Sequence, residues 1–263
     1  METPPPDPLD ADSDGSDSFG ERQIAAAEAD GEAIPSAEGL EIVGDARPGR
    51  LIQVCGYAVN GAIRCEFAWM RYFDNGSSSY IQGENEAVYL VTADDVDSYL
   101  AVEVVAIGDG ELEGETLRIY ANEHRKISCD LKMQEEIERN FFLAHAAFDV
   151  SLLLRHKWEK VKLSVTRKGF SIRIRGSPRI VLDQKFLPCV AITVPKEHST
   201  GFLIHFSGWS ESYLLTAESS LLRDIIVLTM RLFLLRTGIE MAFLGDHLSS
   251  IRSIKVQCAL KLI

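Results

Sequence analysis

The sequence predicts a mainly β protein of two successive units, the second of which is capped by a C-terminal helix. Short segments of alternating apolar and polar residues fill positions 39–122 and 144–216, and turn residues separate them. The apolar run Leu221–Arg236 follows with the spacing of a helix. We expect this helix to cover the open side of the second group of strands, because an apolar sheet face must be buried against another element.

Residues 1–38 precede both units and differ from them in composition. They are rich in Pro, Asp, Ser and Glu, and Phe19 is their only aromatic residue. Because such a segment buries too little apolar surface to offset its ordering entropy, we predict a disordered acidic tail. The same composition fits a contact segment for a basic partner, with Ser13, Ser16 and Ser18 as candidate phosphorylation sites.

The cysteines and the N-terminus indicate a cytoplasmic protein. The five cysteines form no CxxC pair and are odd in number, so we expect reduced thiols. The N-terminus is acidic and proline-rich, whereas a secretory signal is basic and then apolar. We also expect no transmembrane segment, because Asp224 and Arg231 interrupt the helical run, which is shorter than the ~20 apolar residues of a membrane span.

Residues 39–122 have the pattern of an immunoglobulin-like sandwich. The expected strands lie near Ile42 and at residues 50–59, 63–72, 79–82, 88–91, 99–107 and 117–120. Asn60-Gly61 is a hairpin turn signal. One face of the third strand carries Ile63, Cys65, Phe67 and Trp69. Seven short strands with a tryptophan on the third are typical of this sandwich, although the sixth strand has no cysteine to pair with Cys55.

Residues 123–143 change to a helical period and connect the two units. Asp130 can cap a short helix that runs to Asn140 and places Met133 and Ile137 on one side. A short helix with an apolar edge packs against its neighbours, so we expect the two units to be held together rather than flexibly tethered.

Residues 144–238 predict a pleckstrin-homology-like barrel of seven strands closed by one helix. The expected strands are residues 147–154, 160–166, 170–175, 180–186, 190–194, 201–206 and 212–216. Ser219 and Ser220 offer N-cap hydroxyls to the helix, and Gly238 is the expected stop. Residues 239–263 contain apolar clusters without clear caps, and the sequence does not decide whether they cover the helix or form a separate tail.

A basic block interrupts an otherwise acidic chain of net charge −12. Residues 151–179 contain nine basic side chains and one acidic side chain. Strand alternation places four basic residues of this hairpin on one solvent face, and a basic loop lies at one end of it, so that together they form a candidate anionic-ligand or partner surface. Its members are Arg155, Lys157, Lys160, Lys162, Arg173 and Arg175. The simpler interpretation, which the residues alone favour, is a solvated outer face that keeps the sheet soluble and protects an edge. Nucleic acid is not expected, since Trp158 is the only nearby aromatic for base stacking.

No pattern in the sequence points to catalysis. The six histidines are scattered, and the GxSxG, GxxxxGK[ST] and HExxH motifs are absent. Asp94, Asp95 and Asp97 form an acidic cluster, for which a turn before a strand is a simpler explanation than a calcium site. We therefore expect a binding protein, with no catalytic residue, no metal and no cofactor.

One stretch of the first unit has a specific likeness. The segment YLVTADDVDSYLAVEV (residues 89–104), together with WMRY (residues 69–72), resembles the immunoglobulin-like repeats of a plant microtubule-associated protein family described as auxin-induced in root cultures. The order of the two units is similar to the C-terminal half of the plant stomatal closure-related actin-binding proteins. The likeness covers roughly Leu40 to Arg236, and this chain lacks the leucine-rich repeats and the long coiled coil expected of such relatives.

These resemblances imply a function in the plant cytoskeleton. The leading expectation is a non-enzymatic cytoplasmic adaptor that makes protein–protein contacts, with actin filaments or microtubules as possible partners. The alternative is a membrane-surface module that binds inositol phosphates or phosphoinositides through the basic side chains of the second unit.

Overall fold

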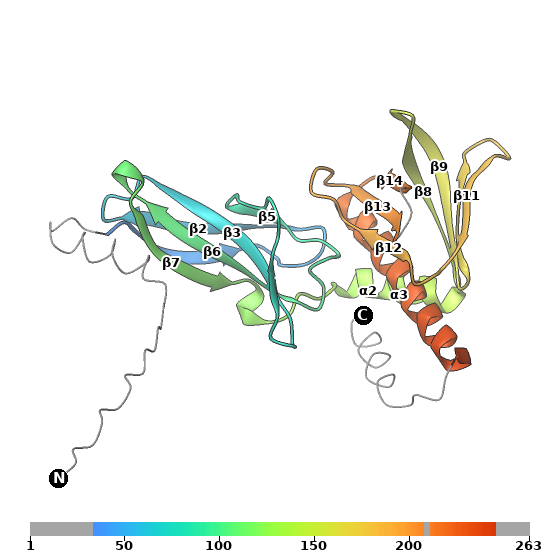
Figure 1. Cartoon of the computed structure of the whole chain (residues 1–263), viewed down its shortest axis with the longest axis horizontal. Helices are drawn as coiled ribbons and strands as arrows, with labels where there is room; N and C mark the ends of the chain where they lie inside the picture. The colour runs from blue at the N-terminus through green and yellow to red at the C-terminus, as the bar shows by residue number, and fades with distance from the viewer. Residues whose placement is uncertain (1–33, 208–210, 246–263) are drawn as a thin grey trace, which may run out of the picture.

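The computed structural model describes residues 34–207 and 211–245 and confirms the mainly β class (Figure 1). The described strands form sheets of three, four and seven strands. The predicted tail falls mostly outside the described residues, but its last part does not. Ser36–Glu38 already belong to the first strand, so the boundary predicted at residue 38 is too late.

Two sheets form the N-terminal unit. The first has the order β1 (Ser36–Val43), β2 (Leu51–Val59) and β5 (Val88–Leu90). The second has the order β4 (Ser78–Tyr80), β3 (Arg64–Tyr72), β6 (Tyr99–Ile107) and β7 (Glu113–Tyr120). Short 3₁₀ turns, η1 (Asp109–Glu111) and η2 (Asn122–His124), follow β6 and β7. Each of the strands expected in this unit is present.

The core of this unit is built around Trp69 of β3. Its ring is 1% exposed and stacks on Tyr89 with the ring centroids 4.9 Å apart. Its indole nitrogen donates to the carbonyl of Glu86 at 2.9 Å, so the buried polar atom is satisfied. Ile63 was expected on the same face but is 67% exposed, because it lies in the turn before β3 begins.

The connector contains α2 (Leu131–Leu143), as predicted. Asp130 caps it by accepting a hydrogen bond from the Met133 backbone at 2.8 Å. Met133 and Ile137 are buried, and the Phe141 ring lies 5.4 Å from the ring of Phe233. The apolar edge of α2 therefore packs on the C-terminal helix.

The seven strands of the C-terminal unit form an open antiparallel sheet, not the closed barrel that we expected. Its order is β11-β10-β9-β8-β14-β13-β12, so β11 and β12 are its edges. The strands are β8 (His145–Leu154), β9 (Lys157–Thr166), β10 (Gly169–Ile174), β11 (Ile180–Lys185), β12 (Val190–Thr193), β13 (Gly201–Phe206) and β14 (Ser212–Thr216). The first four strands form one meander and the last three another. The two meanders meet through only two residue pairs between β8 and β14, and the barrel does not close because β11 and β12 are not hydrogen-bonded to each other.

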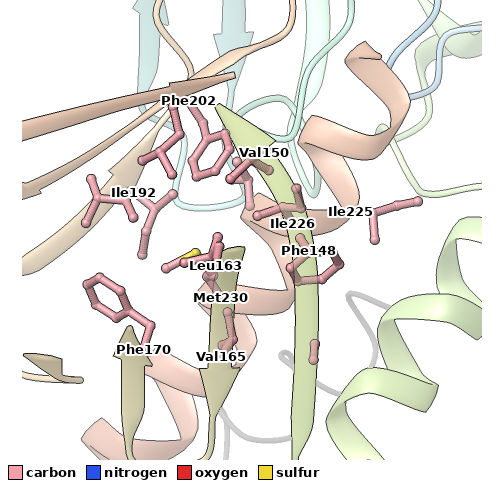
Figure 2. Packing of buried hydrophobic residues seen from close by; sticks show 14 of the residues in the cluster. Phe148, Val150, Leu163, Val165, Phe170, Ile192, Phe202, Ile225, Ile226 and Met230 are labelled. Carbon is pink, nitrogen blue, oxygen red and sulfur yellow. The ribbon is translucent and has the colours of Figure 1, made fainter. Parts of the chain in front are cut away.

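The helix α3 (Ser220–Gly245) covers the apolar side of this sheet (Figure 2). The Ser219 hydroxyl accepts from the Leu222 backbone at 3.2 Å, which gives the predicted N-terminal cap. Ile226, Met230 and Phe233 have no exposed surface and belong to the same apolar cluster as the inward residues of β8, β9 and β13. The stop predicted at Gly238 is wrong, because the helix continues through this residue to Gly245.

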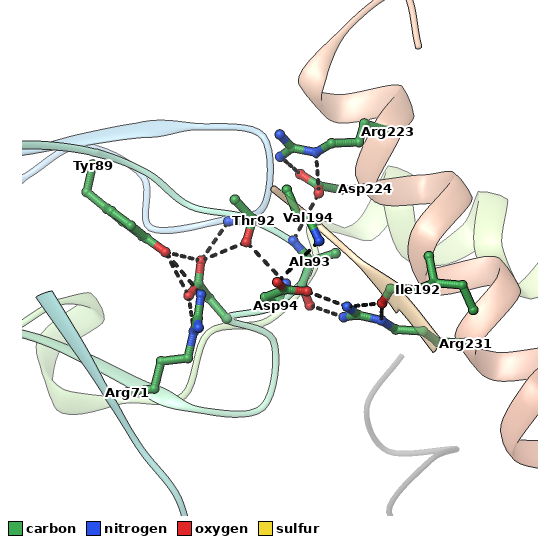
Figure 3. Close-up of polar contacts among 11 residues, drawn as sticks. Arg71, Tyr89, Thr92, Ala93, Asp94, Ile192, Val194, Arg223, Asp224 and Arg231 are labelled. Carbon is green, nitrogen blue, oxygen red and sulfur yellow. Dashed lines mark hydrogen bonds and ion pairs between the residues drawn. The ribbon is translucent and has the colours of Figure 1, made fainter. Parts of the chain in front are cut away.

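Buried polar groups of α3 join the two units (Figure 3). The Asp224 carboxylate accepts from the Ala93 backbone N–H at 2.9 Å and from the Nε and Nη2 groups of Arg223, at 2.9 and 2.7 Å. Neither charged side chain has any exposed surface. Two turns further along the same side of the helix, Arg231 donates to the Ala93 carbonyl at 3.0 Å and to the Asp94 carboxylate. The loop after β5 is therefore anchored directly on α3, in agreement with the expectation of units that are held together.

From the sequence, Asp224 and Arg231 were expected only to interrupt an apolar run. Their structural role is to hydrogen-bond a loop that lies more than a hundred residues earlier in the chain. None of the described helices is long and apolar enough to cross a bilayer.

Candidate anion-binding surface

Of the six predicted basic residues, four lie on the adjacent strands β9 and β10, Arg155 lies in the turn before β9 and Arg175 directly follows β10; all six are exposed. We call this set the basic face: Arg155, Lys157, Lys160, Lys162, Arg173 and Arg175. Along β9 and β10, buried apolar residues alternate with Lys160, Lys162 and Arg173. Val161, Leu163 and Ile172 are at most 1% exposed and fill the core beneath α3. The alternation that places hydrophobic side chains under the helix thus directs the cations to solvent.

Strand register brings four of the six together. Lys162 of β9 and Arg173 of β10 are directly opposite each other in the antiparallel ladder. Two residues along, the Arg175 backbone N–H donates to the Lys160 carbonyl at 2.9 Å, which places these two side chains next to the first pair. Like charges at such positions repel each other across the ladder, so the pairing has an energetic cost that an anion would relieve.

Arg155 and Lys157 lie apart from this group, at the tip of the hairpin. Arg155 and His156 form the two-residue turn between β8 and β9, and both have positive φ, 47° and 66°. Both values fit the left-handed geometry of a tight hairpin turn. The basic face therefore has two parts along the hairpin, the tip with Arg155 and Lys157 and the group of four around Lys162.

A cleft of about 420 Å³ opens beside Lys160 and Arg175. It lies where the two meanders diverge, since β8 pairs with β14 only at Ser151 and Leu152. The remaining polar lining residues are Asp149, Ser151, Thr216 and Glu218. Two cations, two carboxylates and two hydroxyls in one cleft can bind a small anion that also carries hydroxyl groups.

The cations of the basic face have no acidic partner in the described part of the chain. No carboxylate oxygen among residues 34–207 and 211–238 lies within 4.0 Å of any of their six cationic groups. Asp149 is opposite Lys162 in the ladder, yet the two do not form an ion pair. By contrast, ion pairs hold most arginines of the N-terminal unit, for example Arg118 to Glu103 at 2.5 Å. The positive charges of the basic face are therefore not neutralised by the described part of the protein and can bind an external anion.

Sequence reasoning missed a loop with two basic residues that lies beside the hairpin. The loop between β12 and β13 carries Lys196 and His198, both exposed. The His198 ring meets the edge of the Trp158 ring at a centroid distance of 6.3 Å, so this loop lies beside the start of β9. No local signal in the sequence could have shown this proximity, because it depends on how the second meander folds against the first.

The acidic cluster of the first unit is structural. The Asp95 carboxylate is fully buried and accepts from Thr92 N at 2.7 Å and from the Tyr89 hydroxyl at 3.0 Å. Burial raises the pKa of this carboxyl, and its ion pair with Arg71 opposes that rise. Each carboxylate of the cluster faces a cation. The partners of Asp94, Asp95 and Asp97 are Arg231, Arg71 and Lys126, in that order. These oxygens are occupied by the protein's own donors, which leaves little for a metal ion.

The family match found by comparison with known proteins lies within the C-terminal unit. Residues 153–241 match the model of a domain of unknown function, DUF7046. No curated protein matches the chain. The matched segment runs from the end of β8 into α3 and includes all six residues of the basic face. The match covers a minority of the chain and gives no activity for it.

Proposed function

We propose that this protein is a non-enzymatic adaptor that binds an acidic partner surface through the basic face. The proposal depends on one observation, six exposed cations on the strands β9 and β10 and beside their ends, none of which has an acidic partner among the described side chains. Buried apolar residues and the ladder hold these strands, so the charges are positioned before a partner arrives. Such preorganisation lowers the entropy cost of binding and favours fast, salt-dependent association.

The fold type forms part of the same proposal. Sheets of three and four strands packed around Trp69 support an immunoglobulin-like sandwich. Two meanders of four and three strands, followed by α3, support a pleckstrin-homology-like domain whose sheet stays open. Because the loop at Ala93 is fixed on α3, the adaptor would present both domains to its partners as one body.

Cytoskeletal filaments are the partner that the sequence resemblance suggests. The protein is expected to co-sediment with actin filaments or microtubules at low salt, and the pelleted fraction should fall as salt rises, because exposed charges are screened. The Lys162→Glu, Arg173→Glu double variant should lose at least about tenfold in affinity, because each reversed charge turns an attraction into a repulsion. The matched control is Lys132→Glu, Arg139→Glu, which makes the same charge change on the exposed side of α2. Wild-type protein that stays in the supernatant with both filaments would exclude this partner class.

The cleft beside Lys160 and Arg175 favours a second candidate, the headgroup of a phosphoinositide. Its volume of about 420 Å³ and its pair of cations suit a phosphorylated polyol. Vesicles that contain phosphoinositides should carry the protein in flotation, and the Lys160→Glu, Arg175→Glu variant should remain at the bottom of the gradient. Equal flotation of this variant and the wild type would rule out the headgroup site.

A further inference from the structure

The chain contains its own acidic counterpart to the basic face. Residues 1–33 carry ten acidic side chains and a single basic one, Arg22. The basic face carries six exposed cations, and no described carboxylate pairs with them. Opposite net charges of this size attract over distances of about a Debye length, roughly 10 Å at moderate salt.

The N-terminal segment is long enough to reach this surface. The described part of the chain begins just before β1, and this first, blue part of the ribbon lies at the end of the N-terminal unit that is remote from the seven-stranded sheet (Figure 1). A path along the nine residues of β6 and then the ten residues of β9 spans roughly 60 Å at ~3.3 Å per residue. A fully extended chain of 33 residues spans at most ~110 Å, which exceeds this distance.

We propose that residues 1–33 bind the basic face of the same molecule and compete there with an acidic partner. The contact rests on the basic face of the proposed function, but it exists without any partner. Phosphate groups on Ser13, Ser16 or Ser18 would add negative charge and strengthen it. The segment therefore acts as an internal competitor that lowers the affinity of the surface for external anions.

Zero-length cross-linking by a carbodiimide tests the contact directly in the full-length protein. The expected products join carboxylates of residues 1–33 to Lys160 and Lys162, at several times the yield found at Lys132 on α2. Their yield per molecule should not change on dilution, since the contact is intramolecular, and it should fall at about 0.5 M salt. Equal yields at all exposed lysines would overturn the proposal. So would cross-links that disappear on dilution, because these would come from a second copy.

Competition is measured by a full-length variant in which the ten acidic residues of positions 2–32 are replaced by Asn or Gln. At low salt this variant should bind heparin about fivefold more tightly than the wild type, because an intramolecular competitor at high effective concentration is removed. The same replacements in the Lys162→Glu, Arg173→Glu background separate this effect from the change in net charge. A gain of the same size in both backgrounds would overturn the competition. Cross-links as expected, together with no binding of filaments or vesicles, would reject the proposed function and keep the internal contact.

Discussion

The Asp224→Ala variant is expected to unfold with a free energy about 3–5 kcal/mol lower than that of the wild type. Removal of the carboxylate leaves the Arg223 guanidinium charged and fully buried, and it leaves the Ala93 N–H without its acceptor. Chemical denaturation followed by circular dichroism measures this loss. Burial raises the pKa of the Asp224 carboxyl and the Arg223 ion pair opposes that rise, so the two groups depend on each other.

A second variant separates the buried charge from the lost hydrogen bond. Arg223→Met combined with Asp224→Leu removes both charges and fills the space with apolar atoms, so it should be less destabilised than Asp224→Ala alone. If Asp224→Ala instead lost less than about 1 kcal/mol, the buried pair would not hold the junction as described.

The Phe233→Ala variant has the other large expected effect, a loss of about 3–5 kcal/mol. Phe233 has no exposed surface, and its ring lies near Phe141 of α2 and nearly parallel to the ring of Phe186, with centroid distances of 5.4 and 6.5 Å. Truncation therefore opens a cavity where α2, α3 and the segment after β11 meet. In denaturant titrations, a lower midpoint with an unchanged m-value would show that the variant is less stable but exposes the same surface on unfolding.

The matched control lies two residues further along α3. Leu235 is 46% exposed, and its replacement by alanine should change stability by no more than about 0.5 kcal/mol. Similar losses for both variants would mean that α3 does not present Phe233 to the core as described.

The sequence predicted those elements whose residue patterns are local. Alternation located β6 and β13 at their observed bounds, and the Asp130 cap located the start of α2. The end of α3 was missed, because a glycine within a helix costs only ~1 kcal/mol and does not by itself stop a helix. The closed barrel was wrong because strand pairing between the two meanders is a long-range property, and β8 meets β14 at only two residue pairs.

The part of the candidate site that depends on local strand alternation was also predictable. Outward positions of the β9–β10 hairpin follow from alternation, so Lys160, Lys162 and Arg173 were placed on the exposed face from the sequence. Proximity of the His198 loop and the cleft beside Arg175 required the fold. The acidic cluster at Asp94 and Asp95 lies in a turn before β6, as predicted, but its hydrogen bonds to Thr92 and to Arg231 of α3 could not be predicted from the sequence.

Elution from a heparin column tests most directly whether the basic face is an anion-binding surface. Although the chain has a net charge of −12, the wild type should be retained at low salt and elute as salt rises. The Lys162→Glu, Arg173→Glu variant should pass through, whereas Lys132→Glu, Arg139→Glu should elute with the wild type. A wild type that is not retained, or a reversed face that is retained equally well, would contradict the account.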